Sequence, residues 1–352
     1  MAAMKDIILE DRIIGVNEKP FIIAEMSGNH NQSLDRALAI VEEAAKAGVD
    51  AIKLQTYTPD TMTIDFEGGL FSINDKDSLW YGKNLYELYG LAQTPWDWHK
   101  PIFDKARELG LIPFSTPFDE TSVDFLEEMG VSAYKIASFE NIDWPLLKKV
   151  AATNKPVIMS TGAATLADIA GSVDVLRKHG CKDLVLLKCT STYPATPENS
   201  NLFTIPSMRD VFQCHIGLSD HTLGIGAAVA SVALGARVIE KHFTLSRADG
   251  GTDAAFSIEP DELKSVVEET ERAFLALGSV QYGIQKTEEK SLRYKRSVYV
   301  VKDIKAGEPF TKNNIRVIRP GDGLKPRYYE DVLGRKATVD LKRGTPVKWK
   351  YF

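Results

Sequence analysis

The sequence has little that suggests a nucleic-acid-binding, membrane or disulfide-stabilised protein. Its 352 residues carry a formal net charge of −5 with no long basic block, so nucleic-acid binding has little support. No apolar stretch reaches the ~20 residues that a membrane helix needs. The first six residues lack the charged and apolar regions of a signal peptide. We therefore expect a cytoplasmic protein with neither a nucleic-acid nor a membrane partner.

Cysteine is also sparse. The three cysteines, Cys181, Cys189 and Cys214, form an odd-numbered set without the spacing of a metal site. We interpret them as buried free thiols in a reducing compartment.

Short apolar runs bounded by polar residues or glycine recur eight times in the first ~245 residues, which is typical of buried strands. These runs are residues 21–24, 51–55, 112–115, 133–137, 157–160, 184–189, 215–218 and 237–241. Amphipathic helical patterns alternate with them, at residues 34–47, 96–109, 121–129, 144–152, 166–179 and 225–234, with a last helix from about 261 to 277. The alternation predicts an α/β protein with a (β/α)8 TIM barrel.

Two segments depart from the regular repeat. Residues 56–94 form an unusually long connection after the second strand, and we interpret it as a loop on the face where barrel enzymes build their sites. Residues 7–16 have the pattern of a small hairpin, which we expect to plug the bottom of the barrel.

The composition changes after Gly278. Residues 281–296 are charged and poor in large apolar side chains, which indicates a linker between a barrel domain at 1–280 and a small all-β module at 297–352. Strand-like runs within the module are 297–301, 315–318 and 337–339. So small a module buries little core by itself, so we expect it to dock on its own barrel or on a partner's.

Two histidines occupy equivalent places at the ends of neighbouring strands. His221 follows Ser219 by two residues, and His242 follows Glu240 by two. Because residues i and i+2 of a strand share a face, all four side chains should point into one space. Two histidines with water or substrate completing the shell suit Mn²⁺ best, with Mg²⁺ or Co²⁺ as alternatives, and fit less well with a closed zinc site. Such a metal would act as a Lewis acid on a carbonyl oxygen.

Two lysines lie inside apolar strands, at Lys53 and Lys135, with hydroxyl side chains at the ends of several other strands. Ammonium groups and hydroxyl donors together indicate a site for a small molecule with more than one anionic group. The alternative is a structural network in which the lysines pair with Glu25 and Glu240.

The other histidines carry less weight. His99 and His179 lie in helical patterns and are expected to face solvent, His215 is interpreted as structural, and His30 stays ambiguous.

The ordered set of these motifs resembles the sialic acid synthase family over essentially the whole chain. The matching pieces are Ala24-Glu25-Met26-Ser27-Gly28-Asn29-His30, Lys53-Leu54-Gln55, Tyr134-Lys135-Ile136-Ala137-Ser138, Met159-Ser160-Thr161-Gly162, Leu218-Ser219-Asp220-His221-Thr222 and Glu240-Lys241-His242-Phe243-Thr244. The tail, with Lys295-Arg296-Ser297 and Arg319-Pro320-Gly321-Asp322-Gly323, resembles the family's antifreeze-like (SAF, β-clip) domain.

Family membership implies a transferase that condenses phosphoenolpyruvate with an aldehydic amino sugar and water, releasing phosphate by C–O cleavage. By matching position, the pyruvyl carboxylate would be held by Lys53, Gln55 and Thr116, and the phosphate by Lys135, Ser138, Ser160 and Ser219. His221 and His242 would bind the metal, and Glu25, Glu240 and His242 are the catalytic candidates. The remaining substrate-binding candidates are Tyr193, Asp253 and Arg319.

Two departures point to the branch of this family that makes pseudaminic acid. The strand-6 motif of the neuraminate type usually has an asparagine, where this chain reads Cys189-Thr190-Ser191-Thr192-Tyr193, and its Pro-Gly-Pro-Asp-His is replaced by residues 250–257. The aromatic segments 79–89 and 94–99 are similar to that branch, whose acceptor is 2,4-diacetamido-2,4,6-trideoxy-β-L-altrose. An aromatic loop would suit its methyl and acetyl groups, or the aromatic residues could simply pack the loop.

Rival interpretations stay open. The same family contains N-acetylneuraminate and legionaminate synthases. A metal-dependent aldolase or epimerase would explain the histidines but leave the lysines and serines unused. A sugar-binding protein built around the tail would leave the polar barrel mouth without a purpose. The resemblance also implies a homodimer in which the SAF domain covers the partner's barrel mouth and Arg319 reaches the sugar's acetamido group.

Overall fold

Eight parallel strands close into a barrel in the computed structural model, which describes residues 4–76 and 78–352. Neighbouring strands follow the order β10-β3-β4-β5-β6-β7-β8-β9. Their bounds are β3 Phe21–Glu25, β4 Ala51–Thr56, β5 Ile112–Pro117, β6 Tyr134–Ile136, β7 Val157–Ser160, β8 Leu184–Cys189, β9 His215–Asp220 and β10 Val238–His242. Each strand overlaps one predicted apolar run, so the predicted TIM barrel is confirmed.

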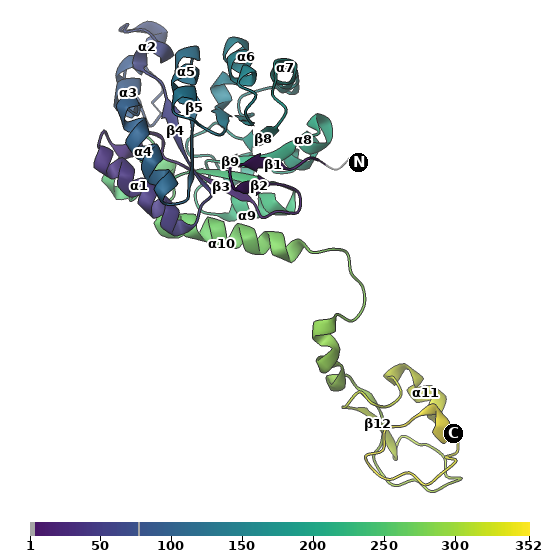
Figure 1. The fold of residues 1–352 in the computed structure, drawn as a ribbon. Helices are drawn as coiled ribbons and strands as arrows, with labels where there is room; N and C mark the ends of the chain where they lie inside the picture. Colours follow the sequence, from purple (N-terminus) through teal and green to yellow (C-terminus); the bar gives the residue numbers. More distant parts are fainter. Residues whose placement is uncertain (1–3, 77) are drawn as a thin grey trace. The chain divides into compact units, whose positions relative to one another are not determined.

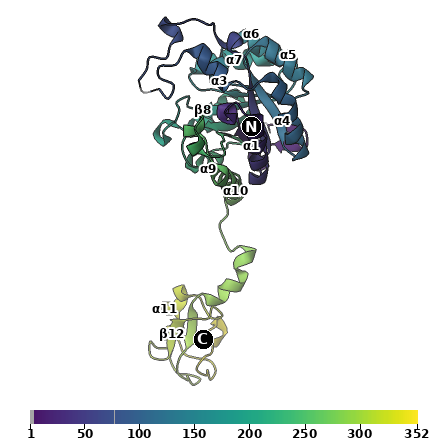
Figure 2. The same ribbon diagram turned by 90° about the vertical axis from the view of Figure 1, so that its left-hand side faces the viewer.

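Helices follow the strands and surround the barrel (Figures 1 and 2). They are α1 Leu34–Ala47, α2 Pro59–Met62, α3 Leu85–Ala92, α4 Trp96–Glu108, α5 Glu120–Glu128, α6 Trp144–Ala152, α7 Leu166–Lys178, α8 Thr204–Phe212, α9 Gly226–Ala233 and α10 Pro260–Leu277. The Ser33 hydroxyl caps the start of α1, and Gly48 ends it at φ 85°. Within the described part of the chain, none of the helices is long and apolar enough to cross a membrane.

Two helical segments were missed in the sequence. The connection 56–94 holds α2 and α3 rather than a continuous loop. Helix α8 also went unpredicted, although Ile205, Met208 and Phe212 form its buried face and Pro206 lies in its first turn, where proline is tolerated.

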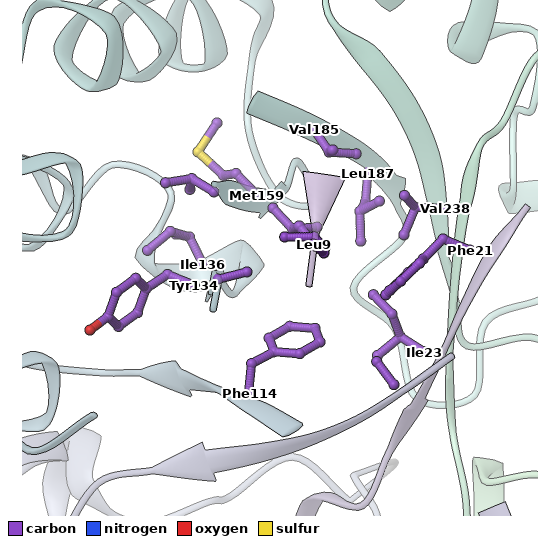
Figure 3. Packing of buried hydrophobic residues seen from close by; sticks show 14 of the residues in the cluster. Leu9, Phe21, Ile23, Phe114, Tyr134, Ile136, Met159, Val185, Leu187 and Val238 are labelled. Carbon is purple, nitrogen blue, oxygen red and sulfur yellow. The ribbon is translucent and has the colours of Figure 1, made fainter. Parts of the chain in front are cut away.

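The lower half of the barrel interior is apolar. Leu9, from the hairpin of β1 Ile7–Leu9 and β2 Arg12–Ile14, lies among side chains of the barrel strands, including Phe114, Leu187 and Val238 (Figure 3). This agrees with the expected plug at the barrel's bottom. Gly217 of β9 leaves room at this level, because a Cβ there would collide with the Val238 carbonyl and Leu187. The packed lower half leaves the polar chemistry to the carboxyl ends of the strands.

The chain divides into two compact units, Met1–Gly278 and Ser279–Phe352. The second unit begins with a 3-10 helix, Lys286–Tyr294, within the segment predicted as a linker. Its strands β11 Ser297–Val300 and β12 Ile315–Ile318 pair antiparallel, and α11 spans Tyr329–Val332. Its own core packs around residues such as Val298 and Phe310. The strand predicted at 337–339 is wrong: Ala337 is buried in this core, but the chain forms only an isolated bridge there, between Lys336 and Pro309.

Candidate active site

Every strand of the barrel contributes an inward-facing polar or thiol side chain near its carboxyl end, where alternation places it above the apolar layer. These side chains are Glu25, Lys53, Gln55, Thr116, Lys135, Ser160, Cys189, Ser219, Glu240 and His242. All are buried except Gln55, which is partly buried. Such a concentration of buried polar groups is unusual in a protein interior and marks a candidate site.

Lys53 is the centre of the first cluster. Its ammonium lies 2.5 Å from Glu25 Oε2 and 3.8 Å from Glu240 Oε2, and it donates to Thr116 Oγ1 at 3.1 Å. The Gln55 amide donates to Glu25 Oε1 at 2.9 Å. Of the three residues predicted to hold the donor's carboxylate, Lys53 and Gln55 contact the Glu25 carboxylate, and Thr116 contacts Lys53.

Lys135 is the centre of the second cluster. Its ammonium donates to Ser160 Oγ at 2.7 Å and lies 3.6 Å from Glu240 Oε1. The Ser219 hydroxyl donates to Glu240 Oε1 at 3.0 Å. Ser138 is buried nearby and accepts a hydrogen bond from the Gly162 amide at 3.2 Å. Both clusters share Glu240, so the ion-pair network weighed from the sequence is present in this structure.

The two carboxylates of the network titrate in opposite directions. Burial raises the pKa of Glu25 to about 7, against the attraction of Lys53. Burial acts on Glu240 in the same sense, but Lys135, Lys53 and the Ser219 hydrogen bond outweigh it and lower its pKa. Glu240 is therefore the stable anion of the pair, and Glu25 is the carboxyl that can gain or lose a proton near neutral pH.

The two histidines lie side by side, with ring centroids 5.2 Å apart. His221 Nδ1 donates to the Thr190 carbonyl at 3.0 Å, which fixes the tautomer and leaves Nε2 to bind another group. His242 is buried and its Nδ1 has no hydrogen-bond partner. Burial, and then the neighbouring His221, keep the pKa of His242 well below its usual value, so its imidazole is neutral.

These rings fit a metal ion held by two protein ligands. Metal–nitrogen bonds are about 2.0–2.1 Å long for zinc and similar for related ions, so rings at this separation can share one ion. Across residues 4–76 and 78–352 there is no set of three or more His, Cys, Asp or Glu side chains arranged to hold a metal. An ion bound here would complete its coordination shell with water or substrate. A buried nitrogen without a hydrogen-bond partner, such as His242 Nδ1, is expected at such a site.

Comparison with known proteins agrees with this arrangement. The NeuB family model matches residues 40–282, and the SAF domain model matches residues 295–352. A pseudaminic acid synthase of Campylobacter jejuni is 44% identical over 332 residues, covering 94% of this chain and 96% of that protein. The pseudaminic acid synthase of Helicobacter pylori is 42% identical over 331 residues, covering 94% and 97%.

The chain belongs to the NeuB family. Among solved structures, an N-acetylneuraminic acid synthetase from Leptospira borgpetersenii, in complex with citrate, superimposes with a TM-score of 0.73. It is 32% identical and covers 84% of this chain and 98% of its own. The resemblance to the sialic acid synthases and the antifreeze-like tail is thereby confirmed.

Aromatic side chains surround the histidines of this NeuB-family barrel. The Tyr193 ring lies 4.5 Å from that of His221 and 5.0 Å from that of Phe256. Trp80, from the long segment after β4, lies 6.1 Å from Tyr193 and donates its Nε1–H to the Thr252 carbonyl at 3.0 Å. The predicted aromatic segment therefore reaches the histidine pair through Tyr193.

Asp253 joins this region to the first cluster. It accepts a short hydrogen bond from the Ser27 hydroxyl and a longer one, at 3.4 Å, from the Gly28 amide. The Gln55 amide donates to Ser27 Oγ at 3.1 Å. Ser27 is held at φ 49°, a conformation that few residues other than glycine adopt and one that is common at functional sites.

Three residues near the site were missed or undervalued in the sequence. Ser27 was recognised only as part of a family motif, and its contacts with Asp253 and Gln55 were not predicted. Glu140, in the 3-10 helix Ser138–Glu140, has a buried Oε2 without a partner, and burial raises its pKa to about 7. Cys189, interpreted as a packing residue, lies close to His221 and Ser138, and their effect outweighs burial and lowers its pKa to about 7. Glu140 has no periodicity or motif signal of its own, whereas Cys189 lies at the inward-facing end of a predicted strand and could have been found from alternation.

Two other predictions concern Arg319 and His99. Arg319 is exposed in the second unit, so its assignment to the sugar stays a prediction. The prediction that His99 faces solvent is wrong: it is buried, and its Nε2 hydrogen-bonds Thr56 Oγ1 at 2.7 Å. The partner, Thr56, is the last residue of β4, and the periodicity of the helix that carries His99 gives no information about it. The three cysteines are buried and free, as predicted.

Proposed function

We propose that the protein is a pseudaminic acid synthase that condenses phosphoenolpyruvate with 2,4-diacetamido-2,4,6-trideoxy-β-L-altrose and water, giving pseudaminic acid and phosphate. The observation that carries the proposal is the pair of buried ammonium groups, Lys53 and Lys135, facing one interior space with hydroxyl donors from neighbouring strands. The identity of 42–44% to curated pseudaminic acid synthases supports the choice of reaction.

Phosphoenolpyruvate would place one of its two anionic groups at each lysine. Its carboxylate would lie against Lys53, Gln55 and Thr116, of which Lys53 and Gln55 contact Glu25 in this structure and Thr116 contacts Lys53. Its phosphate would lie against Lys135 and the hydroxyls of Ser138, Ser160 and Ser219. Charge-assisted hydrogen bonds of this kind orient a small dianionic molecule strongly in a water-poor site.

The reaction needs two bonds made and one broken. Carbon 3 of the enol ether attacks the aldehyde carbon of the sugar, water adds at carbon 2, and the tetrahedral intermediate expels phosphate by cleavage of its C–O bond. A divalent metal bound by His221 and His242, Mn²⁺ by preference, would supply a Lewis acid for the aldehyde oxygen. Glu25, with Glu240 beside it, is our candidate to handle the water that adds at carbon 2, because its pKa of about 7 lets it gain or lose a proton near neutral pH.

The aromatic wall of Trp80 and Tyr193 supports the acceptor assignment. A 6-deoxy sugar with two acetamido groups exposes more methyl surface than N-acetylmannosamine, and aromatic faces suit such surfaces. Asp253 accepts hydrogen bonds from the Ser27 hydroxyl and the Gly28 amide, and its carboxylate can accept a further one from a polar group of the sugar.

The test is phosphate release from phosphoenolpyruvate labelled with ¹⁸O at the bridging oxygen, with Mn²⁺ and each candidate sugar in turn. We expect turnover with the diacetamido altrose and ¹⁸O in the released phosphate. Preference for the legionaminate or neuraminate precursor would change the proposed acceptor sugar but leave the proposed reaction type unchanged. Turnover with pyruvate in place of phosphoenolpyruvate would favour an aldolase and contradict the proposal.

We further propose a cytoplasmic homodimer in which the SAF domain covers the partner's barrel and supplies Arg319 to the sugar. The free thiols suit a reducing compartment. Mixing His242→Ala with Arg319→Ala tests the dimer, since a mixed dimer would contain one complete site. Recovery of roughly a quarter of wild-type activity after subunit exchange is expected. Full activity of Arg319→Ala alone, or no recovery on mixing, would contradict this arrangement.

A further inference from the structure

A buried ion pair lies directly behind the two histidines, on the outer face of the same two strands. Asp220 immediately precedes His221, and Lys241 immediately precedes His242. The register of β9 and β10 places Asp220 and Lys241 directly opposite each other. Because side chains alternate along a strand, the pair points away from the barrel interior at the level where the histidines point into it.

The pair is fully enclosed and fully hydrogen-bonded. The side chains of Lys241 and Asp220 are only 1% and 2% exposed, and Lys241 Nζ lies 2.8 Å from Asp220 Oδ2. The ammonium also donates to the carbonyls of Thr222 at 2.7 Å and Gly224 at 3.0 Å. Asp220 Oδ1 accepts from the Thr222 amide at 2.9 Å and its hydroxyl at 2.8 Å. All three ammonium hydrogens therefore have acceptors, and both carboxylate oxygens have donors.

Stability alone does not account for such a pair. Removing two charges from water is costly, and apolar residues of similar volume often stabilise a buried position as well or better. The pair contributes directed hydrogen bonds. They connect β9 to β10 side by side and hold the carbonyls of residues 222 and 224. The backbone that immediately follows His221 is thereby tied to the strand that carries His242.

The other contacts of the histidines hold each residue separately and do not connect one histidine to the other. The His221 ring is held by the Thr190 carbonyl, and the His221 carbonyl accepts from the Ala195 amide at 3.0 Å. The His242 carbonyl accepts from the Ile258 amide at 2.8 Å. Each histidine is thus anchored to its own surroundings, and the relation between the two rings depends on how β9 meets β10.

We propose that Asp220 and Lys241 are positioning residues that set the separation and direction of His221 and His242, and with them the affinity for a divalent metal ion. This inference rests on the metal site of the proposed function. It assigns no chemistry to the pair, which contacts neither substrate nor metal.

The test measures Mn²⁺ affinity of the full-length protein by electron paramagnetic resonance of free Mn²⁺. Lys241→Met should weaken Mn²⁺ binding by about 10–100-fold, the loss typical when a group supporting a metal ligand is removed. Phosphoenolpyruvate affinity, measured calorimetrically in the presence of chelator, should stay within about twofold. Lys178→Met is the matched control, because Lys178 forms an exposed ion pair with Asp174 at 2.5 Å and should bind Mn²⁺ like the wild type.

A milder variant keeps the inference open to refutation if Lys241→Met does not fold. Thr222→Val keeps the shape of a buried residue and removes one hydrogen bond to Asp220, so Mn²⁺ binding should weaken by roughly 2–10-fold. Wild-type Mn²⁺ affinity in either folded variant would overturn the inference. So would a parallel loss of Mn²⁺ and phosphoenolpyruvate binding, which a merely structural role would produce.

Wild-type protein and His242→Ala complete the experiment. If wild type binds Mn²⁺ and His242→Ala does not, unchanged affinity in Lys241→Met refutes the positioning role alone. If the wild type neither binds Mn²⁺ nor turns over phosphoenolpyruvate, the metal-dependent function itself fails, and the positioning role fails with it.

Discussion

Replacing Lys53 by methionine removes the ammonium that neutralises Glu25 inside the barrel. The side chain is 4% exposed, and its loss leaves the Glu25 carboxylate with only the Gln55 amide nearby. Breaking a buried pair in this way costs about 3–5 kcal/mol when the remaining charge persists. At roughly 2–4 °C of melting temperature per kcal/mol, the variant should melt about 6–20 °C below the wild type.

The loss should depend on pH in a defined direction. Burial already raises the pKa of Glu25 to about 7, and Lys53 is one of the groups that lower it, so the variant's value is higher still. A carboxyl whose folded pKa lies above its unfolded value loses stability as pH rises between the two. The destabilisation of Lys53→Met should therefore be small at pH 6, where Glu25 is protonated in both proteins, and larger at pH 8, where the wild-type carboxyl is ionised.

Ligand binding gives the second readout of the same variant. Loss of a charged hydrogen-bond partner weakens binding by about 1.5–3 kcal/mol, so phosphoenolpyruvate should bind about 10–150-fold more weakly. Thermal melts at the two pH values and calorimetric titration test both effects. Lys188→Met is the control, since Lys188 is partly buried on β8 and donates to two neutral oxygens. Equal destabilisation at both pH values, or unchanged phosphoenolpyruvate affinity, would refute the reasoning.

Three further predictions address the metal, the proton and the acceptor. His242→Ala should abolish turnover and lower bound Mn²⁺ on metal analysis; full activity after exhaustive chelation of the wild type would contradict the metal role. Phosphoenolpyruvate binding at pH 8 should be accompanied by uptake of a proton, because an entering anion raises the pKa of Glu25 further. Calorimetry in buffers of different ionisation enthalpy measures this uptake, and Glu25→Gln should remove it. Proton release by the wild type would contradict the prediction. Trp80→Ala should raise KM for the sugar by about 10-fold without changing KM for phosphoenolpyruvate. Tyr81→Ala, which changes the exposed neighbouring residue, should change neither constant. Equal effects of the two variants would contradict a role for Trp80 in the acceptor site.

The barrel could be predicted because its signals are local. Each strand is a short apolar run that ends in a polar residue, and glycines such as Gly48 mark helix ends with backbone conformations that other residues avoid. Helix α8 is short and ends at Gln213 rather than at a glycine, so its end carried no such signal. The third strand of the tail failed for another reason: Ala337 is apolar because it packs in a small core, and burial does not require strand pairing.

The site was predictable to the extent that alternation along strands fixes direction. Ser219 with His221, and Glu240 with His242, share a face once the strands exist, so their meeting follows from spacing alone. Contacts between residues far apart in sequence had no such signal. The approach of Trp80 to Tyr193, and of Ser27 to Asp253, depends on how long connections fold over the barrel mouth, which no periodicity describes.

The two interpretations of the lysines, as an anion site and as an ion-pair network, describe one arrangement. Two ammonium groups and two carboxylates balance in this structure, so the barrel can bury them without a net charge. A phosphate and a carboxylate arriving together would upset that balance unless a protein carboxyl became neutral. Glu25 is suited to do so, because its pKa near 7 makes protonation inexpensive, while Glu240 stays ionised between both lysines. The same pair of carboxylates that stabilises the empty barrel would thus adjust its charge to the donor.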